Sequence, residues 1–166
     1  MKFNTDPAFV GIENLKQKHK TQIAEFETWA AQGAWERFHY SHYDWWAFPI
    51  DQPSSYGFRW VIYEGEVAAL KGDPIFVETY RKGVSLVAAS WGWDAVSQSP
   101  MDHLKTGQSW HQWPIRLYKM AQSVKLFGYD DLFKSLKAYG KDLIKQGEAM
   151  SFNGKDLSWI FRQPDS

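Results

Sequence analysis

The side chains best suited to chemistry in this 166-residue chain lie close together in the stretch HYSHYDWWAFPID, at positions 39–51. His39 and His42 are three residues apart, a spacing that places them on one face of a helix, and Asp44 follows two residues later. Imidazole and carboxylate groups transfer protons and bind metal ions, so one hypothesis is an enzyme that acts through these three residues. Catalytic zinc takes three protein ligands, however, and the sequence fixes no third ligand, so we expect no metal site. The structural alternative is that the histidines form hydrogen bonds inside an aromatic core.

The tryptophans suggest a second hypothesis, a binding surface, because the chain has ten of them and 17% of its residues are aromatic. Tryptophan faces stack on flat rings or hold a cation, and an arginine such as Arg116 binds an anion through two parallel hydrogen bonds. Six tryptophans fall in three short clusters near expected helix ends or loops: Trp45, Trp46, Trp91, Trp93, Trp110 and Trp113. The candidate ligand-binding residues are His42, Asp44, Trp45, Trp46, Trp91, Trp93, Trp110 and Arg116. The structural alternative is that these large side chains fill gaps where helices cross.

Under the second hypothesis the chain is a binding or interaction module whose aromatic pocket ends in His42 and Arg116. Its ligand is an unknown peptide, protein or small molecule. Basic and acidic residues balance at 19 each, so no overall electrostatic field favours a nucleic acid as partner. The chain has no cysteine for a thiolate nucleophile, no G-x-S-x-G turn and no glycine-rich phosphate loop. We therefore expect no cofactor, and an enzyme is the less favoured class.

Hydropathy indicates that the chain does not cross a membrane. The longest apolar stretches, such as SLVAASWGW at 85–93, are about half as long as the roughly 18 residues that a membrane-spanning helix needs. The first 20 residues lack the apolar run of a signal peptide. We therefore expect a cytoplasmic protein.

Apolar residues recur every three or four positions in four long stretches, which is the spacing of amphipathic helices. Two of these stretches follow the dipeptides Asp6-Pro7 and Asp73-Pro74, which are typical helix starts. The expected helices cover about residues 8–31, 74–91, 117–127 and 130–144. Gly128 separates the last two, which are therefore expected to be antiparallel neighbours. The sequence predicts an all-α fold, a single-domain bundle of about five to six helices over residues 1–166.

Residues 58–70 allow two interpretations. Tryptophan, valine, isoleucine and tyrosine favour strands, so this stretch is consistent with a small hairpin that turns at Glu64-Gly65. It is also consistent with a loop followed by a short helix near 63–71, with Val67 facing inward. We favour the helix.

Part of the chain resembles a known family. The stretch SHYDWWAFPIDQPSS is similar to the H-x-x-x-W-x-F-P-x-x-x-x-S signature in the conserved region of opioid growth factor receptor proteins. The matching residues here are His42, Trp46, Phe48, Pro49 and Ser54. The segment EVAALKGD resembles a later acidic-then-apolar segment of that family, at Glu66, Val67 and Leu70. The stretch RLYKMAQSVKLFGYDDLFKSL is similar to its R-I-T-R-I-L-x-S-L-x-x-L-G run, at Arg116, Lys119, Ser123 and Gly128.

The resemblance covers about residues 40–140 and keeps the family's order of motifs. It implies an all-helical domain, and the best-known members are described as receptors for an enkephalin peptide. The chain lacks the acidic and repetitive tails of the vertebrate receptors, so we expect a compact stand-alone member and do not transfer that ligand to it. His42 and Arg116 are the polar residues that this resemblance and the aromatic-pocket hypothesis share.

Overall fold

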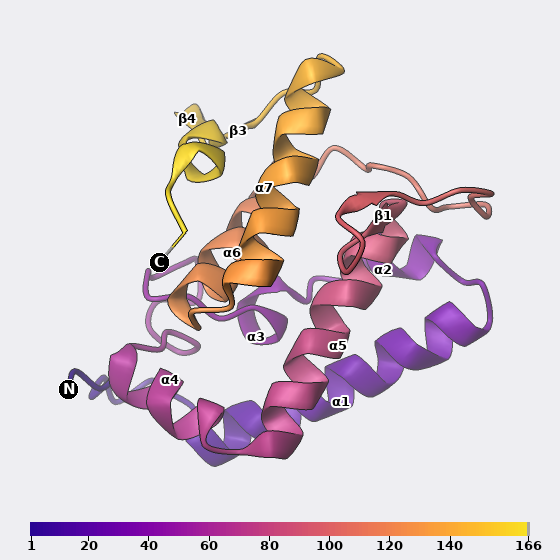
Figure 1. The fold of residues 1–166 in the computed structure, drawn as a ribbon. Helices are drawn as coiled ribbons and strands as arrows, with labels where there is room; N and C mark the ends of the chain where they lie inside the picture. Colours follow the sequence, from indigo (N-terminus) through magenta and orange to yellow (C-terminus); the bar gives the residue numbers. More distant parts are fainter. Residues whose placement is uncertain (166) are drawn as a thin grey trace.

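The computed structural model describes residues 1–165 and shows a mainly helical chain (Figure 1). The α-helices are α1 Ile12–Ala31, α2 Glu36–Tyr40, α3 Asp44–Ala47, α4 Glu64–Lys71, α5 Pro74–Ser90, α6 Pro114–Leu126 and α7 Asp130–Lys145. Two short antiparallel hairpins, β1–β2 and β3–β4, pair Trp93–Asp94 with Ser99–Pro100 and Ser151–Phe152 with Lys155–Asp156. A 3₁₀-helix, η1, covers Ser158–Arg162. The all-α prediction is confirmed. The described residues form seven α-helices rather than five to six, because α2 and α3 are too short to show a helical period in the sequence.

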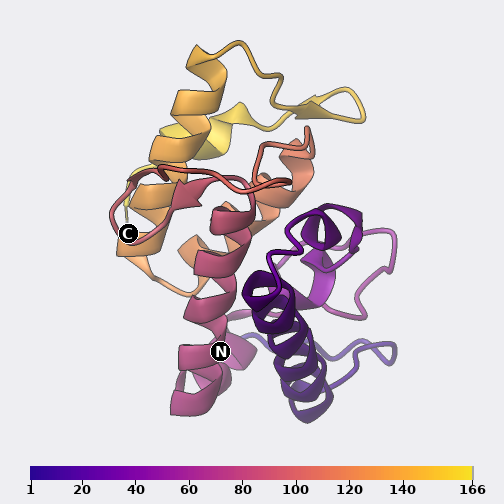
Figure 2. The ribbon, with the colours of Figure 1, turned by 90° about the vertical axis from the view of Figure 1, so that its right-hand side faces the viewer.

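The buried side chains form one hydrophobic cluster to which all the long helices contribute. Its members include Ile23 on α1, Tyr80 on α5, Val124 on α6 and Phe133 on α7, all inaccessible to solvent. Helices α1 and α5 lie side by side (Figure 2). They approach closely at Gly83, where an added Cβ atom would lie 2.6 Å from Cδ1 of Ile23. The end of the Ile23 side chain therefore occupies the space that a side chain at position 83 would need.

The first helix begins later than predicted. The side chain of Asp6 accepts a hydrogen bond from the backbone N–H of Ala8 at 2.8 Å, which forms a turn rather than a helix cap. Gly11 then adopts a φ of +88°, outside the helical region, and α1 begins at Ile12. The prediction that α1 starts near residue 8 is therefore wrong, although its buried face and its end at Ala31 agree with the expected helix.

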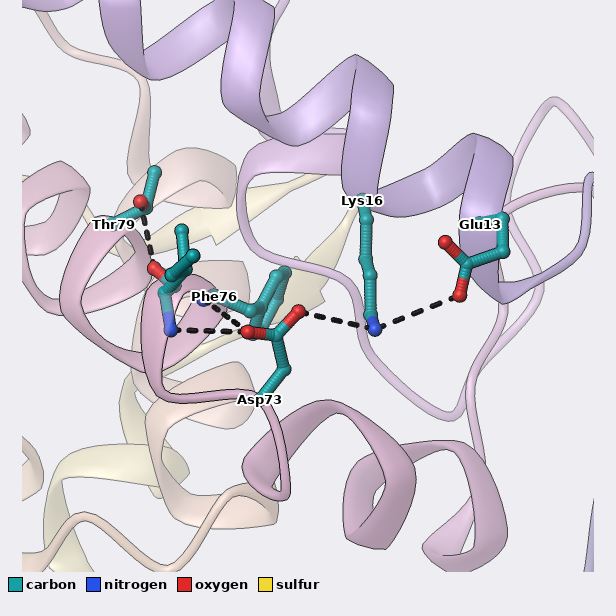
Figure 3. Close-up of polar contacts among 6 residues, drawn as sticks. Glu13, Lys16, Asp73, Phe76 and Thr79 are labelled. Carbon is teal, nitrogen blue, oxygen red and sulfur yellow. Dashed lines mark hydrogen bonds and ion pairs between the residues drawn. The ribbon is translucent and has the colours of Figure 1, made fainter.

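The start of α5 agrees with the prediction and is linked to α1 by charged side chains (Figure 3). The carboxylate of Asp73 accepts hydrogen bonds from the backbone N–H groups of Ile75 and Phe76, at 3.0 and 3.4 Å. Its other oxygen lies 3.1 Å from Nζ of Lys16, which is also 3.6 Å from Glu13. The hydrogen bond with Lys16 lowers the pKa of Asp73. These contacts fix the N-terminal end of α5 against the first turns of α1.

Residues 64–71 form helix α4, so the alternative of a hairpin near 58–70 is wrong. The reason is the position of Glu66 in the first turn. Its carboxylate accepts hydrogen bonds from the backbone N–H groups of Tyr63, at 3.0 Å, and Asn4, at 2.9 Å. Satisfying an otherwise unpaired N–H group at the helix start stabilises the helix over the strand that the aromatic and branched residues favour.

Helices α6 and α7 are joined at Gly128, which has a φ of +75°, and they pack against each other as predicted (Figure 1). The C-terminal segment runs back along α7, and Ile160 and Phe161 of η1 are buried in the core. An added Cβ atom at Gly140 would lie 2.5 Å from the ring of Phe161, so η1 sits directly on the α7 backbone. Among residues 1–165, no helix combines the length and the hydropathy needed to span a membrane.

Candidate ligand-binding groove

A groove of about 410 Å³ opens between α3, the loop that follows it, the first half of α6 and the β3–β4 turn. This volume is within the range of small-molecule sites, roughly 300 to 1,000 Å³. The residues that line it include Asp44, Trp45, Gln52, Ser54, Trp113, Arg116, Tyr118, Lys119, Phe152 and Asn153, with the exposed His42 beside them. Four of the predicted ligand-binding residues therefore line one concavity: His42, Asp44, Trp45 and Arg116.

A buried ion pair lies in this groove. Oδ2 of Asp44 accepts a hydrogen bond from Nζ of Lys119 at 2.9 Å, and both side chains are almost completely buried. The same Nζ lies 4.7 Å from the ring centroid of Trp45, close enough for a cation–π interaction. The indole N–H of Trp45 is buried without a hydrogen-bond partner among the described residues. The groove thus combines an aromatic wall with a charge pair whose removal from water has a large free-energy cost.

Arg116 is 3% exposed and connects α6 to the end of α2. Its Nη1 donates hydrogen bonds to the backbone carbonyls of Phe38 and His39, at 3.2 and 3.0 Å. Carbonyl groups at a helix C-terminus carry partial negative charge, so they are suitable partners for a guanidinium group. The guanidinium carbon also lies 5.0 Å from the ring centroid of Tyr43 and 5.1 Å from that of Trp113. Arg116 is thus a structural clamp that also faces the groove.

The outer walls of the groove are aromatic and partly open to solvent. Trp113 is 40% exposed and Phe152 is 36% exposed. Tyr118 also lines the groove but is largely buried, and its hydroxyl group accepts a hydrogen bond from the side-chain amide of Gln122 at 3.0 Å. Large aromatic side chains that stay partly exposed beside a concave surface are typical of binding sites.

The three residues of the enzyme hypothesis do not converge. Nε2 of His39 is 2.6 Å from the carbonyl oxygen of Gly107, and its ring stacks on that of His111 with centroids 4.1 Å apart. Burial lowers the pKa of His39, partly offset by its hydrogen bond with Gly107. His42 is exposed instead, with its ring centroid 6.4 Å from that of Trp45, and Asp44 is paired with Lys119. No hydrogen bond within residues 1–165 joins any two of these three side chains, and His39 packs in the core rather than in the groove.

The remaining tryptophans lie elsewhere. Trp91, Trp93 and Trp110 surround Tyr139 of α7, with ring centroids 5.0 to 6.1 Å from it. Trp93 also donates a hydrogen bond from its indole nitrogen to the hydroxyl group of Ser135 at 3.1 Å. None of these three tryptophans lines the groove. We call them, with Tyr139, the Tyr139 cluster, and their packing fits the structural alternative.

Trp46 is also separate from the groove, although it is adjacent to Trp45 in the sequence. Its indole nitrogen donates a hydrogen bond to the side chain of Gln22 on α1 at 2.9 Å. Its ring packs on Trp60, with centroids 5.3 Å apart. The short helix α3 thus directs Trp46 toward α1 and Trp45 toward the groove, because adjacent residues of a helix point in different directions.

Several groove residues were not among the predicted ones. Lys119 is three residues after Arg116, so the helical spacing places both on one face of α6. Phe152 precedes Asn153-Gly154, a dipeptide typical of two-residue hairpin turns, and both turn residues have positive φ values, 51° and 76°. These two signals could have been found in the sequence. The proximity of Lys119 and Phe152 to Asp44 could not have been found, because no local sequence pattern indicates that α3, α6 and the β3–β4 turn lie together.

Within residues 1–165, no cluster of three or more histidine, aspartate or glutamate side chains is placed to hold a metal ion. The chain was compared with protein-family models, with curated proteins and with solved structures, and no match was found in any of them. The groove itself is therefore the basis on which a function can be assigned.

Proposed function

We propose that this chain is a binding or interaction module, in which the groove between α3, α6 and the β3–β4 turn holds a ligand with a flat apolar body and a polar end. Trp45, Trp113 and Phe152 would contact the apolar body. The polar end would face the side of the groove where Arg116 and Lys119 lie. No step of covalent chemistry is part of this proposal.

One observation carries the proposal: a concave surface combines partly exposed aromatic rings with buried charged side chains. Exposed rings alone are common on protein surfaces, and a buried ion pair alone occurs in many cores. Here the Asp44–Lys119 pair and Trp113 line the same 410 Å³ groove. A few polar groups on a mainly apolar wall are the usual composition of a small-molecule site.

We further propose membership of the opioid growth factor receptor conserved-region family and a cytoplasmic location. The family proposal is supported by contacts between the matched segments. The hydroxyl group of Ser123 donates a hydrogen bond to the carbonyl oxygen of Pro49 at 2.8 Å and accepts one from Tyr80 at 2.7 Å. Pro49 and Ser123, which belong to separate parts of the matched pattern, are thus joined by a hydrogen bond in the core. Phe48 is buried beside them, with its ring centroid 6.3 Å from that of Tyr80.

A fragment screen read by nuclear magnetic resonance tests the binding proposal. Each of the ten tryptophans gives one indole ¹H–¹⁵N signal, and single substitutions assign the signals. A library of small aromatic compounds is added to the ¹⁵N-labelled chain. We expect compounds that bind to shift the signals of Trp45 and Trp113 and to leave those of Trp93 and Trp110 unchanged.

Substitution at Trp113 provides the specificity test. Trp113→Ala removes one wall of the groove, and we expect a loss of affinity of about five- to 150-fold, since stacking on an aromatic ring contributes roughly 1 to 3 kcal/mol. Ile144→Ala is the control, because Ile144 is 42% exposed on α7 and does not line the groove. The proposal is wrong if no compound shifts the two signals, or if both variants weaken binding equally.

A further inference from the structure

We propose that the ligand of the groove is a small aromatic carboxylate, a flat ring system that bears one negatively charged group. This inference rests on the proposed binding function and specifies its ligand class. It follows from the excess positive charge in the groove and from the cations that already contact its tryptophan rings.

Positive charge is in excess in the groove. Two cationic side chains, Arg116 and Lys119, and one carboxylate, Asp44, line it. All three are buried, so water screens them weakly and their charges act strongly on a bound ligand. The charges of Asp44 and Lys119 nearly cancel, so the positive charge of Arg116 is the net charge of the groove. Its partners, the carbonyls of Phe38 and His39, carry only partial charges.

The aromatic faces argue against a cationic ligand. A tryptophan face that holds a ligand cation must be free of other cations. Here Nζ of Lys119 lies 4.7 Å from the ring centroid of Trp45, and the guanidinium carbon of Arg116 lies 5.1 Å from that of Trp113. Both rings thus already contact a cation of the protein. A second cation would be repelled, whereas a carboxylate would be attracted to the same positions.

Donor groups are also available for a carboxylate. An ammonium group has three N–H donors, and the hydrogen bond to Asp44 at 2.9 Å uses one donor of Lys119. A hydrogen bond between a cation and a carboxylate is roughly twice as strong as one between neutral groups. The ring of such a ligand would lie against Trp113 and Phe152, which are the exposed apolar surfaces of the groove.

Three probes that share one ring system test the ligand class: indole-3-acetate, its neutral amide indole-3-acetamide, and the cationic tryptamine. Their affinities are measured by titration against the indole signal of Trp113. We expect indole-3-acetate to bind at least about tenfold more tightly than the amide, and tryptamine to bind least. Equal affinities, tighter binding of tryptamine, or no binding of the acid would overturn the carboxylate proposal.

Asp44→Asn provides a test that loss of folding cannot imitate, because the expected effect is a gain. The variant keeps the shape of the side chain and removes the charge that offsets Lys119. We expect the affinity for indole-3-acetate to rise by about three- to tenfold, while that for indole-3-acetamide stays constant. An unchanged affinity for the acid would contradict the proposal. The fragment screen decides the binding function separately: if neutral or cationic compounds shift Trp113 and indole-3-acetate does not, the groove is supported and only the carboxylate is rejected.

Discussion

His19 on α1 offers a quantitative test of how the core is built. Its ring is inaccessible to solvent and packs against those of Phe76 and Tyr80, with centroid distances of 4.7 and 5.9 Å. Neither ring nitrogen has a hydrogen-bond partner among the described residues. Burial lowers the pKa of His19 from 6.5 to about 4, and the nearby backbone of Ala47 offsets only part of this effect. The core therefore holds this histidine in its neutral form.

The pH dependence of stability follows from this lowered pKa. In the unfolded chain His19 binds a proton near pH 6.5, whereas in the folded chain it does so only near pH 4. Between these values the unfolded state binds more protons, so the free energy of unfolding falls as the pH falls. The slope is at most about 1.4 kcal/mol per pH unit, which gives a total loss of about 3 kcal/mol by pH 4. Above pH 6.5 His19 makes no such contribution.

Urea unfolding at pH 7.5, 6.5, 5.5 and 4.5 measures this effect in the native chain and in His19→Leu. We expect the free energy of unfolding of the native chain to fall relative to the variant by about 2 to 3 kcal/mol between pH 7.5 and 4.5. At pH 7.5 the variant should be as stable or more stable, because leucine leaves no buried nitrogen without a partner. His42→Leu, which removes an exposed histidine, is the control and should follow the native chain. Parallel curves for the native chain and His19→Leu would refute the reasoning.

Two further predictions use double-mutant cycles measured by urea unfolding. Ile23→Val should lower the free energy of unfolding by about 1 kcal/mol in the native chain but by little or nothing in Gly83→Ala. The reason is that the new Cβ atom, which would lie 2.6 Å from Cδ1 of Ile23, takes up the space vacated by the removed methyl group. Equal losses in both backgrounds would show that α1 and α5 do not meet there. Asp44→Leu alone should lower the free energy of unfolding by about 3 kcal/mol or more, because it leaves Lys119 charged and unpaired. Adding Lys119→Met should recover most of that stability. Additive losses from the two substitutions would contradict a buried ion pair.

The long helices could be predicted from the sequence because each repeats apolar residues with a helical period over several turns. The short helices could not, because α3 has only four residues and no period can be recognised in so few. The start of α1 was misplaced because Asp6-Pro7 is typical both of a helix start and of a turn. The positive φ of Gly11 prevents the helix from starting before Ile12, and this backbone angle is known only from the folded chain.

The candidate site could be predicted only in part. The segment around Trp45 identified one wall of the groove, since helix-end aromatics beside charged residues suggest a pocket. Trp91 and Trp93 carry the same local signal but face Tyr139, because the direction of a side chain depends on which helix packs beside it. The pairing of Asp44 with Lys119 joins residues 75 positions apart, and a single sequence contains no signal for such a contact.

The most direct test of the binding proposal is to locate a bound aromatic carboxylate through intermolecular nuclear Overhauser effects. The chain is saturated with indole-3-acetate, and contacts are recorded between the ligand ring protons and the aromatic protons of the protein. We expect contacts to the rings of Trp113 and Phe152, which line the groove. Contacts to Trp91 and Tyr139 instead, with none to Trp113, would place the ligand in the Tyr139 cluster and contradict the assignment of the groove.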